Sequence, residues 1–120
     1  MANKILVVDD EMSILDAVSL VLEEHGYMVR TIEKGSEAVS QAKRYKPDII
    51  LLDVLMSGTD GREICKAMKQ DDVLKQIPII MMSAHPTAKD SVVSCGANAF
   101  LPKPFNLQSL LDVISKQLKK

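Results

Sequence analysis

Short apolar runs alternate five times with amphipathic stretches along the chain, and this alternation limits the fold more than any other feature of the sequence. A short run of consecutive apolar residues indicates a strand covered on both faces, whereas apolar residues three and four apart indicate a helix. The runs expected to be strands are 5–8, 27–32, 49–52, 79–82 and 99–101. The stretches expected to be helices are 13–25, 35–45, a segment that begins at Asp60, a weaker one that ends at Cys95, and a last one after Asn106. The apolar residues expected on the inner face of the first helix are Ile14, Val18, Val21 and Leu22, and those of the last helix are Leu107, Leu110, Leu111, Ile114 and Leu118.

A strand followed by a helix, repeated five times, predicts a parallel sheet with helices on both of its faces. The crossovers must be right-handed, and five strands in 120 residues fit a flavodoxin-like doubly wound α/β fold with strand order 2-1-3-4-5 and five helices. Ile49–Leu52 is the most apolar run and is expected at the centre. Because we find no repeat, low-complexity segment or linker, residues 1–120 are expected to form one domain.

The overall charge argues against two classes of partner. The net charge is −1 and like charges form no blocks, so no strong field attracts nucleic acid or a membrane surface. The apolar runs are too short to span a membrane, and the start of the chain does not resemble a signal peptide. We therefore expect a cytoplasmic protein that binds neither nucleic acid nor a membrane directly. Cys65 and Cys95 form no metal-binding motif and are expected to be reduced and buried.

Polar residues follow four of the five expected strands. Asp9 and Asp10 follow the first strand and Asp53 follows the third. Ser83 follows the fourth, and Lys103 comes just past the fifth. Ligand sites of parallel sheets lie beyond the carboxyl ends of the strands, so we expect these five side chains to lie close together. Strand ends that simply meet water would account for one or two polar residues, but poorly for three acids, a hydroxyl and a lysine.

Three carboxylates in one cleft repel one another, so either one of them takes up a proton or a cation neutralises them. Mg²⁺ is the expected cation, because it binds through one or two carboxylates together with phosphate oxygens, and Mn²⁺ could substitute for it. A metal, a carboxylate nucleophile, a hydroxyl and a fixed ammonium are the groups that phosphoryl transfer to a carboxylate requires. The sequence thus predicts chemistry of this class.

These motifs resemble the receiver domain of bacterial two-component response regulators, including the chemotaxis regulator. The matching residues are Asp9-Asp10-Glu11, Asp53 with Gly61 eight residues on, Met82-Ser83-Ala84 and Lys103-Pro104-Phe105. Each motif alone is weak, but all four in order at strand ends are specific, and the resemblance covers the whole chain. It implies a phosphorelay protein that accepts a phosphoryl group from a sensor histidine kinase, a phosphotransfer protein or a small phosphodonor.

The resemblance also implies how such a protein works. It is a switch that catalyses its own phosphorylation and dephosphorylation, and is not otherwise an enzyme. It passes the signal to a downstream protein, which the sequence does not identify, through the surface formed by the fourth helix, the fifth strand and the fifth helix. Asp53 would be the phosphoacceptor. Mg²⁺ would be bound by Asp53, by Asp10, by Asp9 directly or through water, and by the main-chain carbonyl of Leu55.

Further roles follow from the same resemblance. Ser83 and Lys103 would each bind a phosphoryl oxygen, and Ser83 would also take part in the switch. Phe100 would be the switch aromatic; the alternative is a phenylalanine of the core. Leu55 and His85 would border the phosphoryl group and tune its lifetime, although His85 could equally be an exposed loop residue without a role.

The sequence departs from the family pattern at Ser57, where the family often has proline, so the loop after Asp53 is expected to be looser. The Lys103–Pro104 peptide bond resembles the family's cis bond, which aims the lysine into the site.

Three other functions fit parts of the pattern. A flavodoxin would need a phosphate-binding loop rich in Ser, Thr and Gly where residues 9–11 are acidic. An aspartate-nucleophile phosphatase would carry Asp-x-Asp after the first strand, together with a cap domain. A degenerate receiver, which would serve only as a binding module, would usually lack one of the acids or the lysine.

The last helix lacks the charged pattern of receivers that dimerise as transcription factors, so a monomer or weak dimer is expected.

Overall fold

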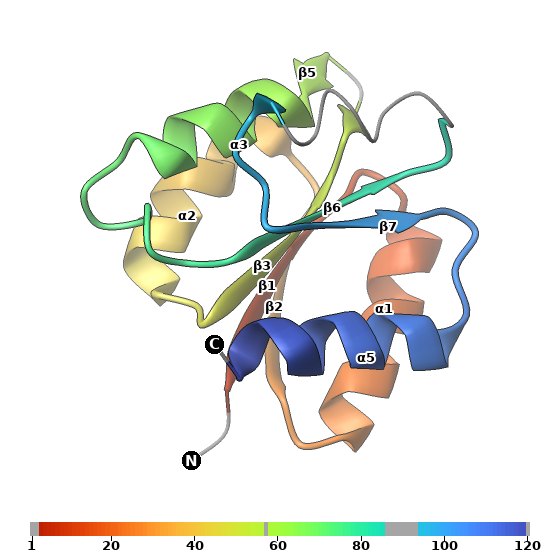
Figure 1. Ribbon diagram of the computed structural model, residues 1–120. Helices are drawn as coiled ribbons and strands as arrows, with labels where there is room; N and C mark the ends of the chain where they lie inside the picture. Colours follow the sequence, from red (N-terminus) through yellow and green to blue (C-terminus); the bar gives the residue numbers. More distant parts are fainter. Residues whose placement is uncertain (1–2, 57, 86–93, 120) are drawn as a thin grey trace.

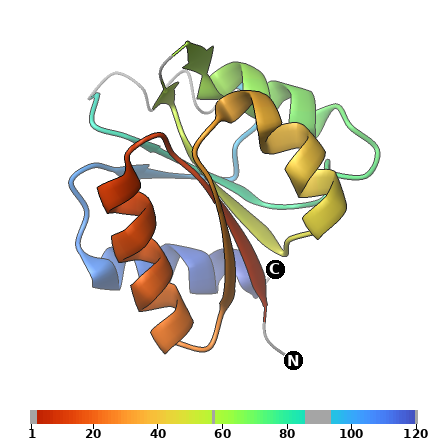
Figure 2. The ribbon, with the colours of Figure 1, turned by 180° about the vertical axis from the view of Figure 1, so that it is seen from behind.

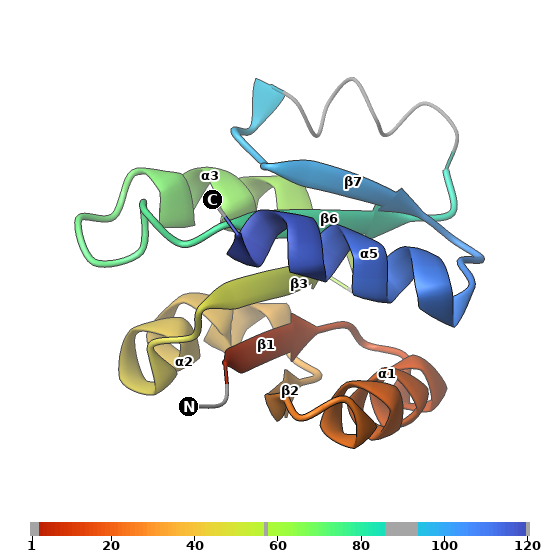
Figure 3. The same cartoon turned by 60° about the horizontal axis from the view of Figure 1, so that its bottom comes forward.

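The computed structural model describes residues 3–56, 58–85 and 94–119. Its main sheet has five parallel strands in the order β2-β1-β3-β6-β7, which Figure 3 shows one above another. These strands are β1 (Lys4–Val8), β2 (Met28–Ile32), β3 (Ile49–Asp53), β6 (Ile79–Ser83) and β7 (Ala99–Pro102). Counted along the chain, this order is the predicted 2-1-3-4-5, with β3 at the centre, so the predicted fold class is confirmed.

Four α-helices are present in the described part of the chain (Figure 1). They are α1 (Met12–Glu24), α2 (Ala38–Tyr45), α3 (Gly61–Lys69) and α5 (Leu107–Leu118), and one turn of 3-10 helix, η1 (Gly35–Glu37), precedes α2. Figures 1 and 2 show α1 and α5 on one face of the sheet and α2 and α3 on the other. The remaining expected helix, which would end at Cys95, falls mostly on residues 86–93, outside the described residues.

The sheet separates two hydrophobic layers. Side chains on each strand alternate between the faces, so Leu6 and Ile50 pack toward α2 and α3 while Ile5 and Leu51 pack toward α1 and α5. Every residue of β3 and of β6 is buried. This double coverage is why β3 and β6 appear in the sequence as apolar runs that are unbroken up to their last residue.

The strand register aligns the carboxyl ends. Val8, the last residue of β1, lies beside Leu52, one residue before the end of β3. Asp53 lies beside Met82, and Ser83 beside Pro102. The residues that follow each strand therefore emerge at the same edge of the sheet.

The predicted starts of the helices agree with the structure more closely than the predicted buried faces do. Asp60 caps α3 by accepting from the Arg62 main-chain N–H at 2.9 Å, and Asn106 caps α5 by accepting from that of Ser109 at 2.7 Å. Leu107, expected on the inner stripe of the last helix, is instead 47% exposed, because it borders a surface cavity beside Pro104.

Two further differences from the sequence analysis concern α1 and the loop after β3. The inner face of α1 includes Leu15, which the predicted stripe omitted. A small antiparallel pair, β4 (Leu55–Met56) and β5 (Thr59–Asp60), was not predicted. Within the described ranges, none of the helices combines the length and apolar character that crossing a membrane requires.

Candidate functional site

Three carboxylates converge at the carboxyl edge of the sheet. Asp9 and Asp10 follow β1 directly, and Asp53 ends β3. Each offers one oxygen to a group whose atoms all lie within 4.8 Å of one another. Asp9 is fully buried and Asp53 is 5% exposed, so two of the three charges are shielded from water. The structure thus brings together the acids that the sequence placed at separate strand ends.

Lys103 supplies the opposite charge from the loop after β7. Its Nζ lies 2.7 Å from Asp9 Oδ2 and 3.2 Å from Asp53 Oδ1, and its side chain is 10% exposed. Burial lowers the pKa of Lys103, but its hydrogen bonds to Asp9 and Asp53 and the charges of both carboxylates outweigh this, and the net pKa is raised. The lysine is therefore held as an ammonium between two acids that belong to different strands.

The same surroundings favour the charged form of Lys103 but disfavour the charged form of Asp53. Burial is the largest influence and raises the pKa of Asp53 from its ordinary 3.8 to about 6, with the charge of Asp9 adding to the rise. The charge and hydrogen bond of Lys103 lower the pKa but do not cancel the rise. Without a cation, the ionised form of Asp53 is consequently under strain near neutral pH.

Ser83 ends β6 and is 3% exposed. Its Oγ accepts a hydrogen bond from the main-chain N–H of His85 at 3.0 Å, which fixes the oxygen while the hydroxyl can still donate. A cavity of about 300 Å³ opens beside it, lined by Glu11, Asp53, Leu55, Ser83, Ala84, His85 and Lys103. The predicted acceptor, hydroxyl and ammonium therefore share one cavity with the exposed Leu55 and His85.

Main-chain contacts hold this edge in place. The Lys103 N–H donates to the Ser83 carbonyl at 2.8 Å, and the Lys103–Pro104 peptide bond is cis, as the sequence predicts. The Gly61 N–H donates to the Val54 carbonyl at 2.7 Å. A Cβ at Gly61 would collide with the Asp53 carbonyl oxygen, so only glycine fits where α3 starts against the end of β3.

Phe100 lies away from the cavity lining. It stands opposite Met81 in the register of β6 and β7, and it is half-buried against the layer under α2 and α3. The structure therefore packs Phe100 against the edge of the core, which is compatible with both of the roles left open by the sequence. Ser57 lies outside the described residues.

Glu11 contributes a contact that the sequence analysis did not assign. Its main-chain N–H donates to Asp9 Oδ1 at 3.0 Å, and its side chain lies 4.0 Å from the Lys103 ammonium. An aspartate that accepts from the N–H two residues on is a common turn, so Asp9-Asp10-Glu11 carried a signal for it. The contact leaves Asp9 Oδ2 directed at Lys103.

The donor set fits a hard divalent cation, because three carboxylate oxygens converge, and Leu55 lines the same cavity as Asp53. A sequence model of the response regulator receiver domain matches residues 5–115 of the chain. The chain belongs to this family. The receiver domain is the signal-receiving module of two-component signal transduction, so this assignment also accounts for the conjunction of acids, hydroxyl and lysine.

One relative of this chain is a longer protein, a transcriptional regulator. The receiver is 42% identical over 108 residues to PhoP of Bacillus subtilis (strain 168), the alkaline phosphatase synthesis transcriptional regulatory protein. That alignment covers 88% of this chain but 44% of PhoP, so the chain spans less than half the length of this relative.

Solved structures agree with the family assignment. The chemotaxis response regulator CheY4 of Vibrio cholerae superposes with a TM-score of 0.91 at 34% identity, covering 98% of this chain and 99% of CheY4. The signal receiver domain of a histidine kinase from Syntrophus aciditrophicus gives 0.90 at 32% identity, with 98% and 91% covered.

Proposed function

We propose that this receiver domain accepts a phosphoryl group on Asp53 from a sensor histidine kinase, a phosphotransfer protein or a small phosphodonor. The observation that carries the proposal is the position of the Lys103 ammonium, which contacts Asp9 at 2.7 Å and Asp53 at 3.2 Å on the wall of the cavity. The cavity reaches both Asp53 and the Ser83 hydroxyl, so a group bound there would meet a nucleophile and two hydrogen-bond donors.

The transfer depends on three side chains of this chain: Asp53 as the nucleophile, and Lys103 and Ser83 as hydrogen-bond donors. A carboxylate oxygen of Asp53 attacks phosphorus, its bond to phosphorus forms, and the bond from phosphorus to the donor's nitrogen or oxygen breaks. Lys103 and Ser83 donate hydrogen bonds to phosphoryl oxygens and stabilise their charge. The chain thereby catalyses its own phosphorylation. Water that later attacks the same phosphorus breaks the bond from phosphorus to the Asp53 oxygen, which releases inorganic phosphate and restores the carboxylate.

Asp9, Asp10, Asp53 and the Leu55 carbonyl would hold Mg²⁺, for which Mn²⁺ could substitute. When bound, the cation would neutralise the clustered carboxylates and the phosphoryl oxygens. The receiver domain of the sensor histidine kinase PA1611 from Pseudomonas aeruginosa PAO1 shares the fold with a TM-score of 0.92 at 24% identity. Its structure has a magnesium ion coordinated in the active site cleft. Leu55 and His85, both exposed on the cavity wall, would control how readily water reaches the phosphoryl group.

Signal output would begin at Ser83. When its hydroxyl turns to the phosphoryl oxygen, space would open behind β6, and Phe100 would move to fill it; the proposal is supported by the position of Phe100 on β7, the strand adjacent to β6. The change would reach partners through the surface around β7 and α5. A shift from one to ninety-nine per cent occupancy takes about 5.5 kcal/mol, which a few charge-assisted hydrogen bonds of about 1.5–3 kcal/mol each supply. The downstream partner, the cytoplasmic location and the monomeric or weakly dimeric state stay predictions.

Intact-mass measurement after incubation with acetyl phosphate and Mg²⁺ tests the acceptor. The wild type should gain one phosphoryl group, and Asp53→Asn should gain none. Asp72→Asn is the matched control, because the Asp72 side chain is 95% exposed and far along the chain from the site. Equal phosphorylation of Asp53→Asn and wild type, or full phosphorylation in excess chelator, would refute the acceptor or the metal role respectively.

A further inference from the structure

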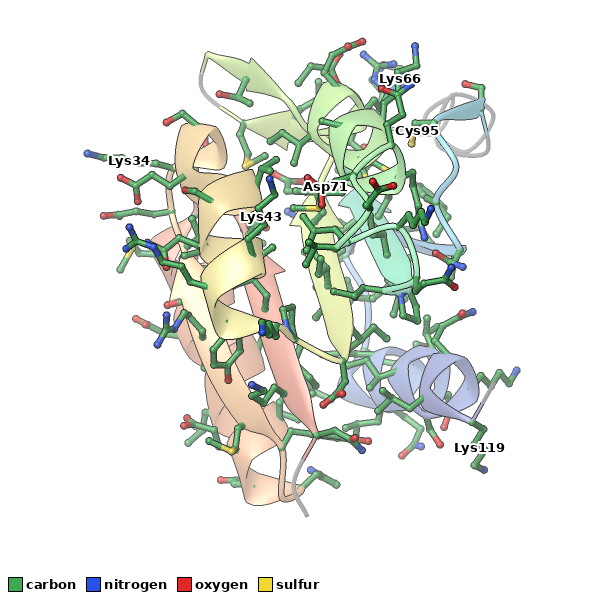
Figure 4. The ribbon with its side chains drawn as sticks, turned by 90° about the vertical axis from the view of Figure 1, so that its left-hand side faces the viewer. Lys34, Lys43, Lys66, Asp71, Cys95 and Lys119 are labelled. Carbon is green, nitrogen blue, oxygen red and sulfur yellow. The ribbon has the colours of Figure 1, made fainter. Side chains whose placement is uncertain are left out.

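Two cysteines meet on the side of the sheet covered by α3. Cys65 lies within α3 and is fully buried, whereas Cys95, shortly before β7, is 7% exposed. The Cys65 Sγ donates to the Cys95 main-chain carbonyl oxygen at 3.5 Å, and both side chains belong to the same hydrophobic cluster. Figure 4 shows Cys95 beside α3. Both are reduced thiols in this structure, and the phosphoryl site uses neither.

The contact between α3 and this segment is fixed at further points. Lys69, one turn after Cys65, donates from Nζ to Asn98 Oδ1 at 2.7 Å and to the Ile77 carbonyl at 3.0 Å. A Cβ at Gly96 would lie 3.3 Å from Lys69 Cγ, so the main chain there packs closely on the lysine stem. Residues 95–98 are therefore held against two successive turns of α3, which keeps Cys65 and Cys95 next to each other.

The two thiols differ in their access to solvent. Cys95 lines a polar cavity of about 320 Å³ together with Asp60, Arg62, Glu63, Lys66 and Ser94. Cys65 has no exposed surface, and burial, reinforced by the contact with Cys95, raises the pKa of its thiol. Because the thiolate is the reactive form, an oxidant entering the cavity should react with Cys95 first and leave Cys65 as the second reactant.

We propose that Cys65 and Cys95 form an oxidisable pair that closes a disulfide between α3 and the segment leading into β7. The Cys95 thiolate attacks hydrogen peroxide, an S–O bond forms as the O–O bond breaks, and the released hydroxide takes up a proton to become water. The Cys65 sulfur then attacks the Cys95 sulfenic acid, forms the S–S bond and releases a second water. In total, two thiols and one peroxide give one disulfide and two waters. This pair acts independently of the proposed phosphoryl transfer.

Peroxide titration of the full chain at pH 7.5, followed by non-reducing peptide mapping, tests the pair. Methionine oxidation would obscure a total mass change, since the chain has seven methionines, so the linked peptide itself is scored. The wild type should give a Cys65–Cys95 linked peptide from a monomeric protein, and dithiothreitol should reverse the link. Cys65→Ser should trap a dimedone-reactive sulfenic acid at Cys95, while Cys95→Ser should leave Cys65 unmodified at the same dose.

A measurement on the wild type removes any dependence on how the variants fold. Brief iodoacetamide treatment of the native protein should label Cys95 at least tenfold faster than Cys65, and 6 M guanidinium chloride should abolish the difference. The proposal is overturned if the two cysteines of the native protein are labelled equally fast, or if no linked peptide forms. It is also overturned if Cys65 in Cys95→Ser is oxidised at the wild-type rate, or if links form only between molecules.

Discussion

Replacement of Asp53 by asparagine should stabilise the metal-free protein at alkaline pH. Asp53 is 5% exposed, and burial together with the charge of Asp9 raises its pKa to about 6. The rise of about 2 above the ordinary value corresponds to about 3 kcal/mol, and water at the open side of the cavity reduces this. We expect Asp53→Asn to raise the free energy of unfolding by about 2 kcal/mol at pH 8.

The pH dependence gives the prediction its sign. Well below pH 3.8 the carboxyl group of Asp53 is protonated in both the folded and the unfolded chain, so ionisation costs nothing. Between pH 4 and pH 6 the unfolded chain releases the proton while the folded chain keeps it, and the wild type loses stability as the pH rises. The advantage of Asp53→Asn should therefore be small at pH 4, below about 1 kcal/mol, grow through this window and level off above pH 7.

Urea unfolding in chelator at pH 4, 6 and 8, followed by circular dichroism, measures the difference. Asp72→Asn serves as the control for removing a charge, because its side chain is 95% exposed, and it should match the wild type at every pH. Mg²⁺ at pH 8 should stabilise the wild type more than Asp53→Asn. An asparagine variant that is no more stable at pH 8, or whose advantage is the same at pH 4, would refute the view that burial and Asp9 strain this carboxylate.

Three further substitutions test the packing at the start of α3, the charge balance of the site and the burial of β3. Gly61→Ala should cost about 2 kcal/mol of unfolding free energy in urea melts, because its methyl group would collide with the Asp53 carbonyl; an unchanged midpoint would show that the chain yields there. Lys103→Met should cost about 3 kcal/mol in chelator, because Asp9 is left buried without its partner; part of this loss should return on adding Mg²⁺ in the same melts. Leu51→Ala, in the fully buried β3, should cost about 2–5 kcal/mol by thermal or urea unfolding, and a loss below 1 kcal/mol would place this residue outside the core.

The fold was predictable because its signals were local. Apolar runs such as Ile49–Leu52 identified covered strands, and Asp60 and Asn106 identified helix starts, since a cap needs only its own helix. The strand order followed from general rules for parallel sheets. Leu107 was predicted to be buried but is exposed. Helical periodicity shows which side of a helix packs against the core, but not where along its length that packing begins.

The convergence of the polar side chains was predictable for a similar reason, since parallel strands deliver their ends to one edge. The contacts within it were not. That Lys103 bridges Asp9 and Asp53, and that the Glu11 N–H fixes the remaining oxygen of Asp9, depend on side-chain rotation. The pairing of Cys65 with Cys95 was equally invisible, because α3 and the segment before β7 come together only through the packing of the sheet.

The division of the core into two layers has a consequence for how such a sequence can change. Ala42 and Leu110 belong to layers on opposite faces of the sheet, so their substitutions should add in their effects on unfolding free energy. One layer can therefore diverge without compensating changes in the other. The site edge is also held by main-chain hydrogen bonds, such as those from Val54 to Met82 and from Lys103 to Ser83, which form whatever the side chains of these residues are. Helix surfaces that select partners can thus diversify while the chemistry at the edge stays the same.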